Sequence, residues 1–392
     1  MLKVGVGAST EKATLAAAAT AARRAMDRAG LAQADFALVF ATIPHSSLYG
    51  RMLERIAEIT RTRHLVGCSA MGIVTSDGEV EDEPAIAVLA LASDTLTATP
   101  FLVRSLRRQG GFAARRMARM LPAPRLSQDF LMLFPDTMTL QAGPFLDGLS
   151  QSWPGVPAVG GGASENGTQM HTYQWCGTEV ASDAVSGALF SGGLNRAFGH
   201  TVACRPIGEP LLVTRAEGHV IFELSGRPAY DVFTGLAQEW ALPDLRSAAG
   251  LFFLGFPCDP SHTRLAPGEY YVRNIHGVDP QEGSLLAGSP VREGQAVSFT
   301  VRDPAHARRD MEAMVGDLAT VCAGRPPRFA VYFNCCGRGT SLYGRPNVDL
   351  DIIRARFKDL PLIGFFTYAE IGPAADGRCL HNYTGVLALV GE

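Results

Sequence analysis

The sequence has few of the features that mark secreted, membrane-spanning or nucleic-acid-binding proteins. Only 8 of its 392 residues are cysteine, and it contains neither a CxxC pair nor a zinc-finger spacing of Cys and His. This argues against a disulfide framework and against a metal site. No run of 18 apolar residues is long enough to span a bilayer, and the opening "MLKVGVGAST" lacks a signal-peptide core. The formal net charge of −3 gives no basic footprint for nucleic acid. We therefore expect a cytoplasmic protein with reduced thiols, and neither a membrane nor a nucleic acid as its partner.

A large apolar core is available instead. Hydrophobic residues make up 47% of the chain and charged residues 19%, and this length predicts two domains or one domain built from repeats. A single basic run, residues 104–120, holds six arginines. It could bind an anion or RNA, but no aromatic platform accompanies it, so we expect a solvated helix or loop face. The glycine cluster at residues 159–164 lacks the GxGxxG register and the Walker lysine, so we expect no nucleotide and no other cofactor.

Three segments share one plan, which indicates an internal repeat. Each begins with an apolar strand and continues through a polar, glycine-bearing loop into a helix with apolar residues at three- and four-residue spacing. Each then has a second apolar stretch that carries a glycine, Gly67, Gly160 or Gly364. Strand, helix and strand within about 35 residues is the βαβ plan, which predicts a parallel sheet buried on both faces. The segments are residues 36–72, 130–167 and 329–372.

The pattern changes between the second and third segments. Stretches such as "GEYYVRNIHGVD" and "GQAVSFTVRD" alternate apolar and polar residues, as antiparallel strands do. The predicted fold class is therefore α/β: mixed sheets built from pseudo-repeated βαβ-like units with an antiparallel insertion, in two lobes. Composition places a boundary near residues 205–217, so we predict an N-terminal domain of residues 1–215 and a C-terminal domain of residues 216–392.

The loops that follow the first strand of each segment are the expected ligand-binding positions. Ligands bind outside the carboxyl ends of the strands in such sheets. The loops read "TIPHSSLYG", "PDTMTLQAG" and "NCCGRGTSLYG". The third presents Cys335, Cys336 and Arg338 at the end of a buried strand. If the strand continues through the two cysteines, one side chain faces the core and the other faces the crevice.

Several motifs together resemble the FIST family (F-box and intracellular signal transduction proteins). "GHVIFELSGRPAYDVF", "VYFNCCGRG", "LIGFFTYAEIGP" and "LHNYTGVLAL" look like its C-terminal half, and "LVGCSAMGIVTSDGEV" looks like its N-terminal half. The resemblance implies a FIST N-type domain followed by a FIST C-type domain, and an intracellular sensory module that binds a small polar ligand, with amino acids suspected. It implies no enzymatic activity. Two positions depart from the family pattern: Ala369 stands where glycine usually precedes the acid, and Ile73 stands where an acid often follows "SxxG".

The family motifs, carried over to this sequence, give a candidate binding site in a crevice between the lobes, lined by the loops of the third segment and with the N-terminal unit as its opposite wall. Arg338 would hold an anionic group of the ligand and Glu370 a cationic one; equally, the two would form an internal ion pair that braces two loops. Closure of the lobes around the ligand would give the signal to a signalling protein in trans. The apolar wall would come from Tyr368 and Phe365, the orienting hydrogen bonds from Asn382 and Thr384, and further contacts from Cys336, Cys68 and Ser69.

Two other classes of function remain open. Cys336 could have a lowered pKa beside Arg338 and act as a nucleophile with His381 as base, in a hydrolase or transferase for an amide, ester or thioester. The plainer interpretation is that Cys336 is a small packing residue. His45 and Ser46 are loop candidates of the same kind, and loop histidines are more often hydrogen-bonded scaffolding than bases. The third class is a protein-interaction module without a ligand, whose crevice is filled by its own side chains.

Overall fold

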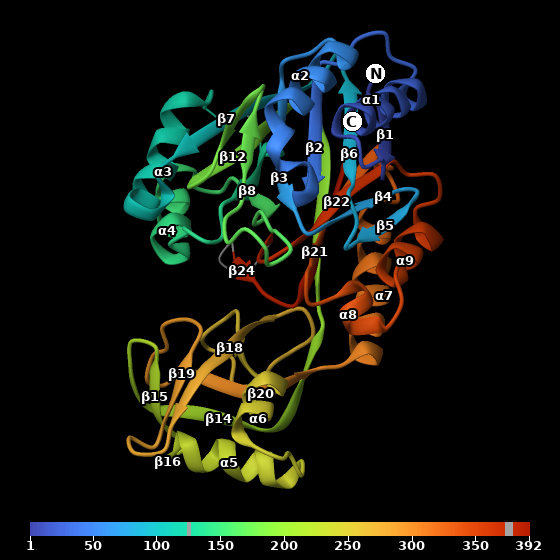
Figure 1. Ribbon diagram of the computed structural model, residues 1–392. Coiled ribbons are helices and arrows are strands. Elements are labelled where there is room, and N and C mark those ends of the chain that lie inside the picture. Colours follow the sequence, from blue (N-terminus) through green and yellow to red (C-terminus); the bar gives the residue numbers. More distant parts are fainter. Residues whose placement is uncertain (124–126, 373–378) are drawn as a thin grey trace.

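The computed structural model describes residues 1–123, 127–372 and 379–392, which form two lobes (Figure 1). We call residues 1–203 and 303–392 the body and residues 204–302 the barrel. Both chain ends lie in the body, at the side away from the barrel (Figure 1). The predicted α/β class with mixed sheets, repeated units and an antiparallel insertion is confirmed.

The body consists of three units with the same order of elements. The first contains β1 (Lys3–Ser9), α1 (Thr14–Ala29), β2 (Phe36–Thr42), a 3-10 turn η1 (Ile43–Leu48), α2 (Tyr49–Thr60), β3 (Leu65–Ala70), β4 (Gly72–Thr75), β5 (Gly78–Glu81) and β6 (Ile86–Ala92). The second contains β7 (Leu96–Arg104), α3 (Leu106–Met120), β8 (Phe130–Pro135), α4 (Ala142–Ser152), β9 (Ala158–Gly161), β10 (Gln174–Cys176), β11 (Glu179–Ala181) and β12 (Ala184–Gly192). The third contains β13 (Asn195–Val202), α7 (Pro304–Val321), β21 (Phe329–Cys335), α8 (Gly339–Tyr343), α9 (Val348–Arg356), β22 (Leu362–Thr367), β23 (Glu370–Gly372), β24 (Cys379–His381) and β25 (Thr384–Gly391).

Each unit forms most of one sheet and contributes a hairpin to the sheet of another unit. The strand orders are β1-β6-β2-β3-β10-β11, β7-β12-β8-β9-β23-β24 and β13-β25-β21-β22-β4-β5. In every sheet one parallel pair, β2–β3, β8–β9 or β21–β22, is followed by a hairpin from a different unit. These pairings form a closed ring. The hairpin of the first unit joins the sheet of the third unit, that of the second joins the sheet of the first, and that of the third joins the sheet of the second. The body therefore has pseudo-threefold symmetry.

One glycine on the second parallel strand is equivalent in the three units. A Cβ added to Gly67, Gly160 or Gly364 would lie 1.7, 2.0 or 1.9 Å from the carbonyl oxygen opposite it on the first strand. Real Cβ atoms do not approach backbone oxygen this closely, so only glycine allows these strands to pair as they do. These are the glycines that ended the second apolar stretch of each repeat in the sequence.

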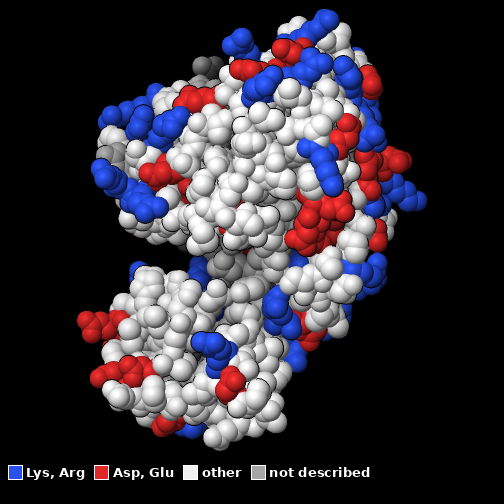
Figure 2. Space-filling view, in the orientation of Figure 1, with Lys and Arg blue, Asp and Glu red and all other residues white. Residues whose placement is uncertain are grey.

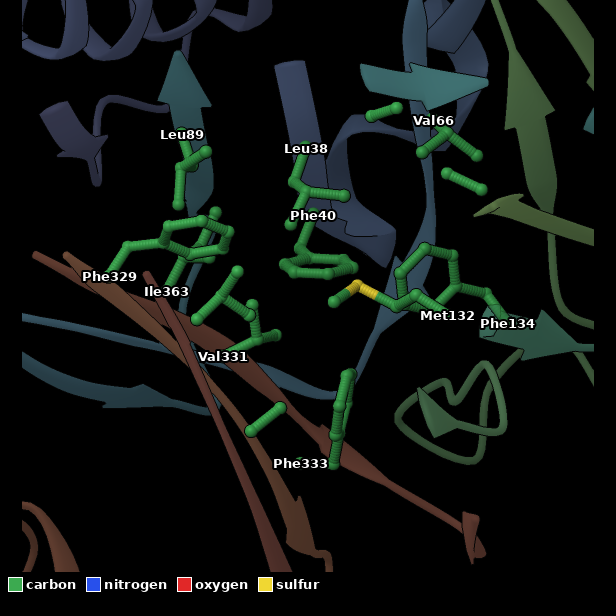
Figure 3. Close-up of a cluster of buried hydrophobic side chains, with 14 of the residues drawn as sticks. Leu38, Phe40, Val66, Leu89, Met132, Phe134, Phe329, Val331, Phe333 and Ile363 are labelled. Carbon is green, nitrogen blue, oxygen red and sulfur yellow. The ribbon is translucent and has the colours of Figure 1, made fainter. Parts of the chain in front are cut away.

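The inner faces of the three sheets meet in one apolar core, and the helix pairs α1–α2, α3–α4 and α7–α9 lie outside them (Figures 1 and 3). Phe40, Phe134 and Phe333 come from equivalent strands, one in each unit, and Phe365 joins them. The ring centroids of Phe40 and Phe134 are 5.3 Å apart, and those of Phe40 and Phe365 are 4.5 Å apart. Such aromatic pairs stabilise beyond their burial alone.

The barrel is inserted into the third unit between β13 and α7. Its strands pair antiparallel in the order β14-β20-β17-β18-β19-β15, and β14 also pairs with β15, which closes the barrel. Its own apolar core includes the helix α5. The predicted boundary at residues 215 and 216 falls inside β14, so the lobes do not coincide with the two predicted domains. The barrel elements are β14 (Cys204–Glu217), β15 (Val220–Leu224), β16 (Arg227–Pro228), α5 (Ala229–Glu239), α6 (Leu245–Leu251), β17 (Phe252–Pro257), β18 (Tyr270–Asp279), β19 (Ser284–Ala287) and β20 (Ala296–Arg302).

The chain crosses between body and barrel at two adjacent points. The amide of Ala203 donates to the carbonyl of Tyr383 at 2.8 Å, and the amide of Asp303 donates to the carbonyl of Ala203 at 3.0 Å. The ring of Tyr383 packs on Phe253 of the barrel, with centroids 4.5 Å apart. This small junction positions the barrel under the strand-end loops of the third unit.

None of the helices in residues 1–123, 127–372 and 379–392 is both long and apolar enough to cross a membrane.

We expect Gly364→Ala to lower the free energy of unfolding by about 3 kcal/mol or more, because its methyl group would overlap the carbonyl oxygen of Tyr332. Gly78→Ala is the matched control, since its nearest neighbour would be the Oδ1 atom of Asn347 at 3.6 Å. The control should change stability by less than about 0.5 kcal/mol. Urea unfolding of both variants checks this, and equal effects would contradict the close approach.

Candidate functional site

The strand-end loops of the third unit face the barrel. Strands β21 and β22 are parallel, so their carboxyl ends lie at one edge of the sheet, where ligands bind in folds of this kind. Figure 2 shows the surface hollowed between the body and the barrel, and we call this hollow the cleft. The barrel, rather than the first unit, forms its opposite wall.

Three partly exposed residues from both lobes, Arg273, Asn382 and Tyr368, are linked by hydrogen bonds at the junction. The Nη1 atom of Arg273, on β18 of the barrel, donates to Oδ1 of Asn382 at 3.4 Å, and its Nη2 atom donates to the carbonyl of Leu380 at 2.9 Å. The Nδ2 atom of Asn382 donates to the carbonyl of Tyr368 at 3.4 Å. The hydroxyl of Tyr368 donates to the carbonyl of Glu165 in the second unit. The structure therefore brings together two predicted residues, Tyr368 and Asn382, with an arginine that the sequence analysis missed.

Arg338 lies below the surface and is fully buried. Its Nε and Nη2 atoms donate to the two carboxylate oxygens of Asp349 at 2.9 and 2.8 Å, a bidentate ion pair. The hydroxyls of Tyr332 and Tyr343 also donate to Asp349, at 2.9 and 2.8 Å. The expected pairing of Arg338 with Glu370 is therefore wrong, because the turn from α8 into α9 brings Asp349 to the guanidinium first. This arginine fixes the loop and does not face the cleft.

Glu370 is also fully buried. Its Oε2 atom accepts hydrogen bonds from the hydroxyl of Thr384 at 2.6 Å and from its amide at 3.3 Å. Burial raises the pKa of Glu370 to about 8, although the hydrogen bonds from Thr384 oppose the shift. The carboxyl is therefore mostly protonated at neutral pH, which does not suit the expected contact with a ligand cation. The other two units carry Ile73 and Gln174 at the equivalent hairpin position.

The two candidate catalytic residues lie in different surroundings. Cys336 is partly exposed, and its amide donates to the carbonyl of Thr367 at 2.9 Å. Burial of the sulfur raises the pKa of the Cys336 thiol, which is opposite to the lowering that the nucleophile alternative requires. The ring of His381 is buried and stacks on His200, with centroids 4.4 Å apart. A neutral thiol is a weak nucleophile, and this geometry gives the enzyme class no support.

The remaining predicted residues are buried behind the surface of the site. Cys335 is a free thiol whose sulfur accepts from the amides of Gly337 at 3.4 Å and Tyr383 at 3.3 Å. The hydroxyl of Ser69 donates to the carbonyl of Ser164 at 3.0 Å. Cys68 and Phe365 belong to the central apolar core, and Thr384 bonds to Glu370.

The other loop candidates lie in the first unit and do not meet these residues. The Nδ1 atom of His45 is 3.0 Å from the hydroxyl of Thr14, and the hydroxyl of Ser46 accepts from Gln169 at 2.9 Å. His45 is fully buried and Ser46 is partly exposed. Over the described ranges of the chain, no three His, Cys, Asp or Glu side chains gather in a group that could hold a metal ion.

We expect stability to depend on the ionisation of Glu370. Its pKa rises from an ordinary 4.5 to about 8 in the folded protein, so the folded state binds a proton that the unfolded chain releases. The free energy of unfolding should fall as pH rises from about 4.5 to 8, by on the order of 4 kcal/mol from this group. Urea titrations from pH 5 to pH 8.5 test this. Glu370→Gln should flatten the profile, whereas the exposed control Glu58→Gln should not; an unchanged slope in Glu370→Gln would refute the assignment.

The thiol of Cys336 should react slowly with iodoacetamide at pH 7, because its raised pKa leaves little thiolate. Peptide mapping by mass spectrometry measures the modified fraction over time, with Cys336→Ala as the control. Complete modification of Cys336 well before the other partly exposed thiols would restore the nucleophile hypothesis.

The chain matches two family models. The FIST N domain matches residues 35–227 and the FIST C domain matches residues 229–373. An uncharacterized protein of Mycobacterium tuberculosis is 31% identical over 393 residues, 99% of both chains, and one of Mycobacterium bovis is 31% identical over 390 residues, 99% of this chain and 98% of the other. An alignment with a solved chorismatase covers 92% of this chain and 93% of that one, at 8% identity and a TM-score of 0.32. Because the two models together match most of its length, the chain belongs to the FIST family, whose domains are generally sensory domains of signal transduction.

Proposed function

We propose that this protein senses a small polar metabolite with an anionic group, with amino acids among the candidates, and binds it in the cleft between body and barrel. We further propose that it works in the cytoplasm. The proposal rests on the position and the hydrogen-bond acceptors of Arg273. Its guanidinium lies at the junction of the lobes, and the oxygens that accept from it are the carbonyls of Val272 and Leu380 and the amide of Asn382.

A guanidinium whose acceptors are all neutral binds a ligand carboxylate more favourably than one that is already paired with a carboxylate. Within the described parts of the chain, none of the ion pairs includes Arg273, whereas Arg338 is already paired with Asp349 at 2.8 Å. A ligand carboxylate would form a charge-assisted, bidentate bond with Arg273. Asn382 and Tyr368 would orient the rest of the ligand through an amide and a ring from the body. An amino-acid ammonium would find main-chain carbonyl oxygens there, such as that of Tyr368.

The proposal requires the lobes to move about the junction. Only two chain crossings, at Ala203 and Asp303, join the barrel to the body. Arg273 comes from the barrel, and Asn382 and Tyr368 come from the body, so a ligand that contacts all three would favour a closed arrangement. Closure of two lobes about a small hinge is a common way to convert binding into a signal. The buried residues Arg338 and Glu370 support this indirectly, because they hold the strand-end loops in place.

We expect Arg273→Ala to weaken ligand binding. A thermal-shift panel of amino acids, monocarboxylates and dicarboxylates should contain at least one compound that stabilises the wild-type protein, by about 2.7 kcal/mol at 100 times its dissociation constant. Loss of the guanidinium should weaken that compound at least roughly tenfold, as expected for a charged hydrogen bond. Isothermal titration calorimetry gives the dissociation constants.

Arg215→Ala is the matched control, since Arg215 is an exposed barrel arginine that pairs with Glu223 at 3.0 Å. It should leave binding unchanged. A ligand that binds equally well to Arg273→Ala would contradict this site, and a panel without any stabilising compound would contradict the proposed ligand class.

A further inference from the structure

The third unit has a groove on its outer surface, on the other side of its sheet from the central core. The groove lies between α7 and α9, which pack side by side over that sheet (Figure 1). It is a cavity of about 460 Å³ with Val315, Val348 and Ile352 in its floor. Val315 and Val348 are buried and Ile352 is partly exposed. The floor is therefore apolar and open to solvent on one side.

Gly316 lines this groove from the interior of α7. A Cβ added there would meet no atom within 4 Å. Glycine inside a helix costs about 1 kcal/mol relative to alanine, and no residue in the described ranges comes close enough to require glycine at this position. In the second unit Gly148 of α4 has a clear use, because a Cβ on it would lie 2.8 Å from the carbonyl oxygen of Gly111 in α3. Gly316 offers the same close approach, but none of the helices among the described residues occupies it.

The rim of the groove carries positive charge that its own side chains do not neutralise. Arg345 and Arg356 line it and are exposed, and they take part in none of the ion pairs found among the described residues. The two acids on the rim are already paired, Glu312 with Arg308 at 3.0 Å and Asp351 with Arg354 at 3.5 Å. The groove is therefore complementary to a surface that combines apolar and acidic side chains.

We propose that the groove between α7 and α9 docks an amphipathic helix of a signalling partner. The partner helix would place a small residue against Gly316 and an apolar ridge on Val315, Val348 and Ile352. Its flanking carboxylates would pair with Arg345 and Arg356. Recognition of this kind reads side chains at i, i+3, i+4 and i+7 of the bound helix. The inference goes beyond ligand sensing and does not depend on it.

The position of α7 explains why a partner would bind here. α7 begins at Pro304, directly after the barrel strand β20 and the crossing residue Asp303. Asp303 caps the helix, since its Oδ1 atom accepts from the amide of His306 at 2.9 Å. A helix docked on α7 therefore lies on the element that leads straight out of the barrel.

The test selects helical peptides of about five turns, roughly 18 residues, from a displayed library against the whole protein. We expect the selected sequences to be acidic amphipathic helices with a small residue on the apolar face. Gly316→Leu fills the groove and should raise their dissociation constant at least tenfold without loss of thermal stability, because leucine is the better helix former. Arg345→Glu with Arg356→Glu should weaken binding by a similar factor.

The matched control is Gly235→Leu. Gly235 is an interior glycine of α5 that is also free of neighbours within 4 Å but faces solvent on the barrel. It should leave peptide affinity unchanged, and so should Arg273→Ala, which separates this proposal from the cleft. Selected helices that bind Gly316→Leu as tightly as wild type, or a selection without acidic helices, would overturn the proposal. A dimer in sedimentation velocity that Gly316→Leu dissociates would assign the groove to a second copy and also overturn it.

Discussion

The pairing of each hairpin with the sheet of another unit is the constraint on which the rest of the structure depends. β4 completes the sheet of the third unit, β10 that of the first and β23 that of the second. No unit can therefore finish its sheet alone, and the three must close into a ring. The ring directs one face of every sheet inward, where Phe40, Phe134 and Phe333 meet. It also forces the connection from β22 to β23 to cross from one sheet to the next, and Tyr368 and Ala369 form that crossing.

The pseudosymmetry provides an internal comparison for the third unit. At the position of Glu370 the other units carry Ile73 and Gln174, and at the position of Cys335 they carry Thr42 and Asp136. A fully buried carboxyl group is costly even when it is protonated, because Thr384 satisfies only one of its oxygens. The third unit is also the unit that carries the barrel. Its buried carboxyl group therefore lies close to the junction of the two lobes, whereas the second unit buries an amide, Gln174, at the equivalent position.

The sequence predicted the repeated units because their long strands are apolar throughout and their glycines recur at one position. The exchanged hairpins were not predictable in the same way, because strands of three or four residues such as β10 and β23 carry too few residues to show a period. Closure of the barrel depends on β14 pairing on both edges, which is a long-range property of strand order.

The candidate site was predicted in part. Tyr368 and Asn382 were found because the family motifs contain them. The partner of Arg338 was not, since Asp349 and Glu370 are both acids within reach in sequence and only the turn between α8 and α9 decides between them. Arg273 lies in an alternating strand whose pattern marks no arginine as special. It is important because it lies at the junction of the two lobes, and no local sequence pattern predicts which residues meet there.

The cleft and the groove are joined by α7, and this has a thermodynamic consequence. β13 also leads into the barrel, but it is paired with β25 along eight residues, and Gly199 leaves room for Met314 of α7 directly against it. A movement of the barrel therefore acts on β13 and α7 together, as one packed layer. If a ligand in the cleft changes the position of that layer, it must change the affinity of the groove for a helix. Reciprocity then requires that the bound helix change the ligand affinity by the same factor. A partner on α7 would set the sensitivity of the sensor as well as receive its signal.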